Sequence, residues 1–322
     1  MKAAYAASFD AEHPLNGLQV GERPEPTVPD GWTVVQVKAT TLNHHDLFTL
    51  KGVGITEDKL PMILGCDAAG IDLATGDEVV VHSVITSPGW VGDETMDPKR
   101  SLLSERYQGT LAEQVAVPRT NIIPKPAGLS YAEAACLPTA WLTAYRMLFV
   151  RGQARPGQTV LVQGATGGVA SAAIVLARAA GLRVWSTART PEKQETAKTL
   201  GAHEAFASGA RLPERVDLVI ETVGKATWSH SVKALRPGGR IVVSGATSGF
   251  DPSAELNRVF FLQLEVVGST MGTRAELHDL IRFLETTGTR PVIDRTMPLD
   301  AARDALALME SGGQVGKIVL EP

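Results

Sequence analysis

The stretch VLVQGATGGVASAAIVLARAAG, residues 160–181, joins an apolar run to a glycine cluster and then to a segment with helical periodicity. That order predicts a strand, a tight turn and a helix, as in a βαβ unit. The residues ATGGVA fit the dinucleotide fingerprint G-x-G-x-x-G/A, with Ala165 and Ala170 in the places of the first and last glycines. Backbone N–H groups and the helix dipole favour a pyrophosphate at such a turn, and a turn without a ligand is the alternative.

Strands and helices alternate after residue 125. Near-continuous apolar strands are expected at 159–164, 183–188, 216–221, 240–245 and 264–270. Because helical segments fill most of the gaps, the pattern predicts an α/β fold with a doubly wound parallel sheet, the Rossmann arrangement.

The residues before 125 show a different sequence pattern. Short β-rich segments at 33–40, 76–84 and 110–117 are bounded by Gly, Pro or Asp and predict an antiparallel or barrel-like unit. Residues 290–322 return to strand, helix and strand and are expected to pack on this first unit. Residues 86–108 show no periodicity and are expected to form a surface loop.

Composition limits the function classes. A chain of 322 residues favours about two domains, and a formal net charge of -4 makes a nucleic-acid partner unexpected. No apolar run reaches the length of a membrane span, and the N-terminus lacks a long hydrophobic core, so we expect a cytoplasmic protein without membrane contact. With only Cys66 and Cys136, a disulfide framework and a four-cysteine zinc lobe are excluded.

The order of motifs resembles that of the medium-chain dehydrogenase/reductase superfamily, in particular its zinc-independent, quinone-oxidoreductase-like (zeta-crystallin-like) branch. Matching stretches run through almost the whole chain and include LNHHDLFTLKG at 42–52, LPMILGCDAAG at 60–70, AACLPTAWLTAYRML at 134–148, LRPGGRIVVSGAT at 235–247 and GKIVL at 316–320. The resemblance implies a GroES-like catalytic domain from residues 1–125 plus 289–322. A Rossmann dinucleotide-binding domain, 126–288, is inserted between these two segments.

Many members of the superfamily carry a catalytic zinc, and the positions here that line up with its ligands are Asn43, Cys66 and Thr139. Zinc takes about four N or S donors in most sites, and an amide and a hydroxyl are poor substitutes, so no metal is expected. A rival metal site would use His44, His45, Asp46, Cys66 and Asp67. Adjacent histidines point in different directions on a strand or a helix, which argues against it.

Without a Lewis acid, reduction of a conjugated carbonyl is favoured over alcohol oxidation. We expect hydride transfer to a small-molecule quinone or α,β-unsaturated carbonyl, with Asn43, Thr139 and the surroundings of Cys66 as polar groups of the pocket. Cys66 as a nucleophile is the sharper alternative to a buried small residue, but the sequence identifies no histidine base beside it. Asp46 either orients a hydrogen-bond donor or relays a proton, or it only caps a helix.

The cofactor is expected to be NADPH. Residues 183–191 contain no acid that would hold ribose hydroxyls, whereas Ser186, Thr187 and Arg189 follow the second strand, and the resemblance places a phosphate-binding lysine at Lys193. From the turns after the other strands and from the resemblance, the remaining cofactor contacts are expected at Thr143, Thr166, Gly167, Gly168, Val169, Val223, Gly245, Ala246, Thr247, Thr270, Met271, Gly272 and Lys317.

Some alternatives stay open. Trp141 is either a wall of the substrate pocket or core. The function alternatives are a zinc-type alcohol dehydrogenase-like enzyme and a nucleotide-binding protein with little turnover. A homodimer is expected, because the strand near 264–270 leaves an open apolar edge of the sheet.

Overall fold

The fingerprint stretch forms a strand, a turn and a helix in the computed structural model, which describes residues 1–322. Strand β11 (Thr159–Gln163) is buried along its whole length, as expected for the centre of a sheet covered on both faces. Gly164 then adopts a φ of +87°, a conformation that favours glycine, and Gly167 caps helix α4 (Gly168–Ala179). The predicted βα unit is confirmed.

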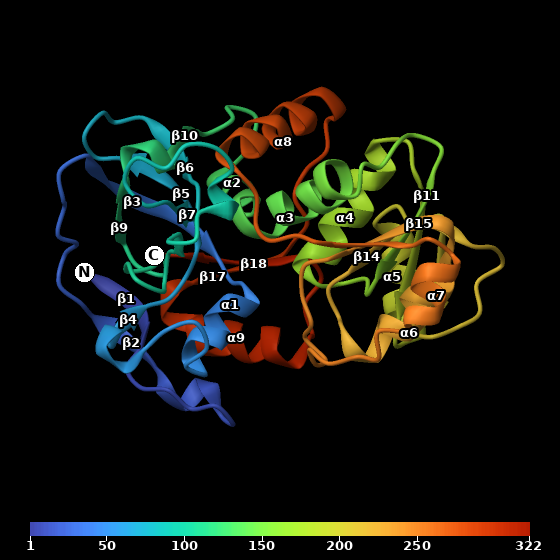
Figure 1. The fold of residues 1–322 in the computed structure, drawn as a ribbon. Helices are drawn as coiled ribbons and strands as arrows, with labels where there is room; N and C mark the ends of the chain where they lie inside the picture. The colour runs from blue at the N-terminus through green and yellow to red at the C-terminus, as the bar shows by residue number, and fades with distance from the viewer. The chain divides into compact units, whose positions relative to one another are not determined.

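Strand β11 lies at the centre of a six-stranded sheet whose order is β13-β12-β11-β14-β15-β16. Every neighbouring pair in this sheet is parallel, so the predicted doubly wound sheet is confirmed. Its other strands are β12 (Arg183–Ala188), β13 (Glu204–Ala207), β14 (Val216–Glu221), β15 (Leu235–Val243) and β16 (Glu265–Gly268). The helices that accompany them in Figure 1 are α3 (Leu142–Tyr145), α4, α5 (Pro191–Thr199), α6 (Lys225–Ala234) and α7 (Leu256–Phe261).

A second, mixed sheet of seven strands follows the order β10-β6-β5-β3-β18-β17, with β9 beside β3. The C-terminal strand β18 pairs antiparallel with β3 and parallel with β17, so the late segment joins the early sheet as expected (Figure 1). These strands are β3 (Trp32–Thr41), β5 (Asp67–Asp72), β6 (Glu78–Val81), β9 (Gln114–Pro118), β10 (Ile122–Pro124), β17 (Ile293–Pro298) and β18 (Lys317–Glu321). Smaller sheets contain β1 (Lys2–Ala6), β2 (Leu18–Glu22) and β4 (Met62–Ile63), and β7 (Val84–Ile85) with β8 (Ser101–Leu102).

Contacts divide the chain into two units. The β-rich unit comprises residues 1–140, 271–285 and 290–322, and the parallel-sheet unit comprises 141–270 and 286–289. This division differs from the expected boundaries, because helix α2 (Tyr131–Ala135) packs on β3 and β5. Residues 271–285, which include most of helix α8 (Arg274–Thr287), also join the β-rich unit, where Arg274 donates to the Thr120 carbonyl.

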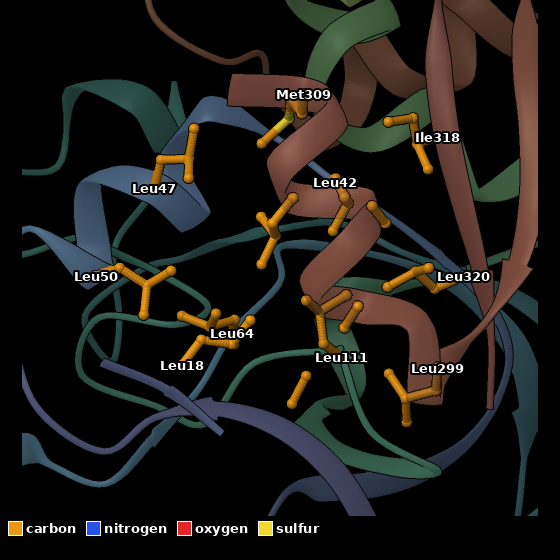
Figure 2. Close-up of a cluster of buried hydrophobic side chains, with 14 of the residues drawn as sticks. Leu18, Leu42, Leu47, Leu50, Leu64, Leu111, Leu299, Met309, Ile318 and Leu320 are labelled. Atoms are coloured by element: carbon orange, nitrogen blue, oxygen red, sulfur yellow. The ribbon is translucent and has the colours of Figure 1, made fainter. Parts of the chain in front are cut away.

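A leucine-rich cluster fixes helix α1 (His44–Leu50) within the β-rich unit. Leu47 and Leu50 of α1 and Met309 of helix α9 (Ala302–Ser311) point into this cluster, together with Ile318 of β18 (Figure 2). Leu50 is fully buried, so truncating it to alanine would cost about 2–5 kcal/mol. The packing therefore holds the start of α1 in a fixed place relative to β18.

The expectation of a surface loop at 86–108 is wrong for its second half. Residues Ser101–Leu102 form β8, and Leu103 is fully buried in a cluster with Val35 and Val81. Residues 86–108 have no apolar periodicity, so the sequence did not predict the burial of Leu103. No helix in the structure combines the length and the apolar character needed to cross a membrane.

Candidate active site

Helix α1 begins with two residues that the sequence singled out, Asn43 and Asp46. One carboxylate oxygen of Asp46 accepts the Asn43 N–H at 2.8 Å, and the other accepts the Gly65 N–H at 2.8 Å. Burial raises the pKa of Asp46, although both N–H donors favour its charged form. Asp46 thus ties α1 to the segment before Cys66, which supports the structural alternative for this residue.

The side chain of Asn43 turns away from the helix and joins a buried ion pair. Lys317 Nζ donates to Asn43 Oδ1 at 2.6 Å, to the Leu42 carbonyl at 2.5 Å and to Asp67 Oδ2 at 3.3 Å. Asp67 Oδ2 also accepts from Asn43 Nδ2 at 2.8 Å and from Thr41 Oγ1 at 2.6 Å. An ammonium has three protons, and all three have acceptors here. Lys317 would have to give up one of these bonds to make its predicted cofactor contact.

A histidine lies beside Cys66, which the sequence did not reveal. Cys66 Sγ is 3.3 Å from His45 Nδ1, and His45 Nε2 is 3.2 Å from Glu105 Oε1. The second oxygen of Glu105 accepts the Leu102 N–H at 2.8 Å, and the thiol donates to the Leu103 carbonyl at 3.3 Å. The pairing depends on β8 and its following turn lying beside α1, and no local pattern signals this.

The charges in this trio are coupled. Burial alone would lower the pKa of His45, but its interactions with Cys66, Glu105 and Asp46 raise that pKa well above its ordinary value. Burial works to raise the pKa of Glu105, yet the hydrogen bonds from His45 and Leu102 hold it below its usual range. Burial raises the pKa of the Cys66 thiol. These three pKa directions fit a His45 imidazolium between the Glu105 carboxylate and the neutral Cys66 thiol.

Thr139 is connected to this region through Ser83. Thr139 lies in a π-helical stretch, Leu137–Trp141, and its hydroxyl is 3.5 Å from Ser83 Oγ, which donates to the Cys66 carbonyl at 2.7 Å. Such π-helical turns are frequent at functional sites. Trp141 is fully buried, which supports its reading as core.

The donor set does not fit a catalytic zinc. The three positions that line up with the metal ligands offer one thiol, one amide and one hydroxyl, and the Asn43 amide oxygen accepts from Lys317. In addition, no three His, Cys, Asp or Glu side chains are grouped so that they would hold a metal ion.

Most of the predicted cofactor residues follow the carboxyl ends of the parallel strands, the edge where such sheets bind ligands. A Cβ on Gly167 would meet no atom within 4 Å, so the N-terminus of α4 is open beside it. This open turn fits a pyrophosphate. Residues that share this edge are Thr166, Gly167, Gly168, Val169, Arg189, Val223, Gly245, Ala246, Thr247 and Thr270. Met271 and Gly272 belong to the β-rich unit, where the Gly272 carbonyl is 2.9 Å from His82 Nε2.

The hydroxyls of Ser186 and Thr187 point beneath the glycine turn. Ser186 donates to the Gly164 carbonyl at 2.9 Å, and Thr187 donates to Gln163 Oε1 at 2.6 Å. Both residues are buried, as is Thr143 in α3, whereas Arg189 is exposed and Lys193 is half-buried in the first turn of α5. A role for Arg189 and Lys193 in binding a phosphate stays a prediction.

A buried network that the sequence did not reveal joins the ends of strands β11 and β14 through helix α6. Gln163 Nε2 donates to Ser231 Oγ at 2.9 Å, and Ser231 donates to Glu221 at 2.6 Å. Glu221 also accepts the N–H groups of Val223 and Gly224 at 2.8 and 3.0 Å. The network holds β11 and β14 together with the turn that contains Val223, at the edge described above.

Two family models match the chain. Residues 29–127 match the alcohol dehydrogenase GroES-like domain, and residues 168–286 match the zinc-binding dehydrogenase family.

Curated relatives span nearly its whole length. An acryloyl-coenzyme A reductase of Sulfurisphaera tokodaii is 28% identical over 96% of this chain and 98% of its own. A zinc-type alcohol dehydrogenase-like protein of Schizosaccharomyces pombe is 31% identical, covering 90% and 91%. A quinone oxidoreductase of Mus musculus is 29% identical, covering 89% and 88%.

A solved structure agrees with these relatives. An NAD-dependent alcohol dehydrogenase superposes with a TM-score of 0.91 at 32% identity, and the match covers 100% of both chains. The two domain models and the full-length relatives agree with the GroES-like and Rossmann arrangement of the two units. The chain belongs to the medium-chain dehydrogenase/reductase superfamily.

Proposed function

We propose that the protein is an NADPH-dependent oxidoreductase that reduces a quinone or an α,β-unsaturated carbonyl without zinc. The observation that carries the proposal is the Lys317–Asn43–Asp67 cluster. Here a buried ammonium is hydrogen-bonded to the residue that lines up with a zinc ligand. Reduction of a conjugated carbonyl needs charge stabilisation but no Lewis acid, so this chemistry suits the site.

The names of two relatives support this class of substrate. Acryloyl-coenzyme A is an α,β-unsaturated thioester, and the mouse relative is named for quinones. Both substrate types carry a conjugated carbonyl group that hydride transfer can reduce. These two names support the proposal that the chain acts like the zinc-independent, quinone-oxidoreductase-like members of the superfamily.

A bound nicotinamide would supply the hydride. In the β-rich unit, Asn43 and Thr139 would act as hydrogen-bond donors to the oxygen on which negative charge develops. The positive charge of Lys317, only 2.6 Å from Asn43 Oδ1, would favour that charge further. Asp46 would hold Asn43 in place through its 2.8 Å hydrogen bond.

The preference for NADPH rests on the end of β12. No acid occurs in residues 183–191, and exposed Arg189 follows the strand directly. Lys193 lies in the first turn of α5, where the helix dipole disfavours a cation. A 2′-phosphate bound by both side chains would offset that cost.

A homodimer is proposed as the assembly. Strand β16 is the edge of the parallel sheet, and Phe250, Phe260 and Phe261 are exposed at 85%, 71% and 79% in the segment before it. Exposed aromatic side chains near an unpaired strand edge favour pairing with a second copy of the same chain.

The test is turnover. NADPH oxidation, followed by its near-ultraviolet absorbance with a panel of quinones and enones, is expected to proceed after prolonged chelation. Tight NADPH binding without turnover would instead indicate a nucleotide-binding protein. Stoichiometric zinc in protein purified without chelator would overturn the zinc-free assignment and favour an alcohol dehydrogenase.

A further inference from the structure

We propose that Cys66 donates the proton that completes reduction of an enone, and that His45 and Glu105 resupply this proton. The inference rests on the proposed reductase function and names residues that this function leaves unassigned. It is carried by the geometry of a three-residue chain of hydrogen bonds from a partly exposed carboxylate to a buried thiol.

The three hydrogen-bonded side chains lie in a fixed order, from Glu105 through His45 to Cys66. Glu105 is held by the Leu102 N–H at 2.8 Å and contacts His45 Nε2 at 3.2 Å. The other ring nitrogen of His45 lies 3.3 Å from Cys66 Sγ. Both ring nitrogens are thus engaged. The thiol proton is bonded only to the Leu103 carbonyl, at 3.3 Å, and this bond would break as the sulfur gives its proton to a substrate. A nucleophile or acid, a base and an orienting carboxylate in this order form a common catalytic arrangement.

The three hydrogen-bonded side chains differ in their exposure to solvent. Cys66 is fully buried, whereas the side chains of His45 and Glu105 are 18% and 27% exposed. Solvent can therefore return a proton to His45 while the thiol stays away from bulk water. A buried cysteine that packed only as a small apolar residue would not need this link to the surface.

The titratable groups that interact with His45 are the Cys66 thiol and the carboxylates of Glu105 and Asp46. Asp46 has both oxygens occupied by backbone N–H groups, so it stabilises the imidazolium by charge alone. These interactions raise the pKa of His45 well above its ordinary value and so favour its acid form. The acid form holds a proton on Nδ1, beside the sulfur.

Other polar groups are less suited to this role. Lys317 is held by three acceptors, one of them the Asp67 carboxylate, whereas the thiol has a single 3.3 Å bond to the Leu103 carbonyl. The Asp46 carboxylate accepts two N–H groups. The hydroxyl of Thr139 is a far weaker acid than a thiol. Cys136, the other cysteine, donates to the Ala132 carbonyl and has no histidine partner.

The chemical step balances. An enone that has accepted hydride at its β-carbon is an enolate, which must gain a proton at its α-carbon. The Cys66 S–H bond breaks as the new C–H bond forms, and the sulfur takes the Nδ1 proton of His45. The imidazolium becomes neutral as the enolate charge disappears, and solvent reprotonates His45. A reduced quinone differs, because its oxygen takes a proton directly from water.

The first experiment compares substrates in His45→Gln, Cys66→Ala and the parent protein. In the parent, kcat/KM for an enone should fall at high pH as His45 loses its proton. In both variants it should fall about 100-fold or more, the range for loss of a general acid, and His45→Gln should lose the basic limb. Quinone reduction should change less than about threefold, because it does not need this acid. Cys136→Ala is the matched control and should follow the parent.

A second variant keeps the proposal open to refutation if His45→Gln does not fold. Glu105→Gln retains a hydrogen-bonding side chain but removes its charge. The basic limb should then move to lower pH by about one unit. NMR titration of the His45 ring in the protein without cofactor should show the same shift.

Failure of the proposed reductase function and failure of the proton-donor role would give different results. A parent that turns over neither quinones nor enones would refute the proposed function and the donor role with it. A parent that reduces enones, together with a His45→Gln variant that keeps the basic limb, would refute the donor role alone. Equal losses for quinone and enone would show that His45 is only structural.

Discussion

Lys317 and Asn43 lie 274 positions apart in the chain, and a 2.6 Å hydrogen bond joins them. The bond brings the first residue of β18 to the N-cap of α1, and Asp67 at the start of β5 completes the cluster. An ammonium, an amide and a carboxylate here satisfy one another without a metal ion.

Replacing Lys317 by methionine should lower the free energy of unfolding by about 3–5 kcal/mol, because Asp67 would remain buried without its countercharge. Urea unfolding would measure the loss. The double variant Lys317→Met with Asp67→Asn should recover part of it, since no uncompensated charge is left. A loss below about 1 kcal/mol in the single variant would show that the pair is not energetically coupled.

Cofactor preference should depend on Arg189 and Lys193. At about 1–1.5 kcal/mol for each contact, replacing both with alanine should weaken NADPH binding about 30- to 150-fold and leave NADH binding nearly unchanged. Fluorescence titration of both cofactors would measure this. Lys198→Ala is the control, because Lys198 lies in the same helix and pairs with Glu195. Equal affinity of the parent for NADH and NADPH would contradict the assignment.

Asn43→Ala and Thr139→Val should each reduce turnover about tenfold or more, the scale of losing one positioned hydrogen-bond donor. Thr139→Val keeps the shape of the side chain, so its unfolding free energy should change less than that of Asn43→Ala. If both variants match the parent on every accepted substrate, the two residues are structural.

Self-association should depend on the exposed aromatic segment before β16. The parent is expected to have twice the monomer mass of 34.2 kDa, and Phe260→Asp should shift it toward the monomer. Light scattering at micromolar concentration would measure both. Val91→Asp is a control at an even more exposed apolar position in the β-rich unit. A monomeric parent would rule out the dimer.

The sequence predicted those parts of the structure that local patterns determine. Residues 160–181 specify β11, the turn and α4, because apolar periodicity and Gly164 act over short distances. The contact between His45 and Cys66 was not predictable, since it requires β5 to lie beside α1. Glu105 was missed because its segment has no periodicity.

The sequence also could not predict the hydrogen-bond partners of buried polar side chains. The hydroxyls of Ser186 and Thr187 bond the glycine turn and Gln163, and the ammonium of Lys317 bonds Asn43 and Asp67. The cofactor contacts of these three residues stay a prediction. Each outcome depends on which buried acceptor lacks a donor, a property of the assembled sheets.

The place of β18 between β3 and β17 has a consequence for synthesis on the ribosome. Residues 141–270 form almost the entire parallel-sheet unit, so this unit can fold as soon as it emerges. The unit that starts at residue 1 must wait for residues 317–321 before its sheet is complete and Asp67 has its countercharge. Strands β3 and β5 therefore emerge before the parallel-sheet unit but complete their sheet after it, and the Asp67 carboxylate must remain hydrated until then.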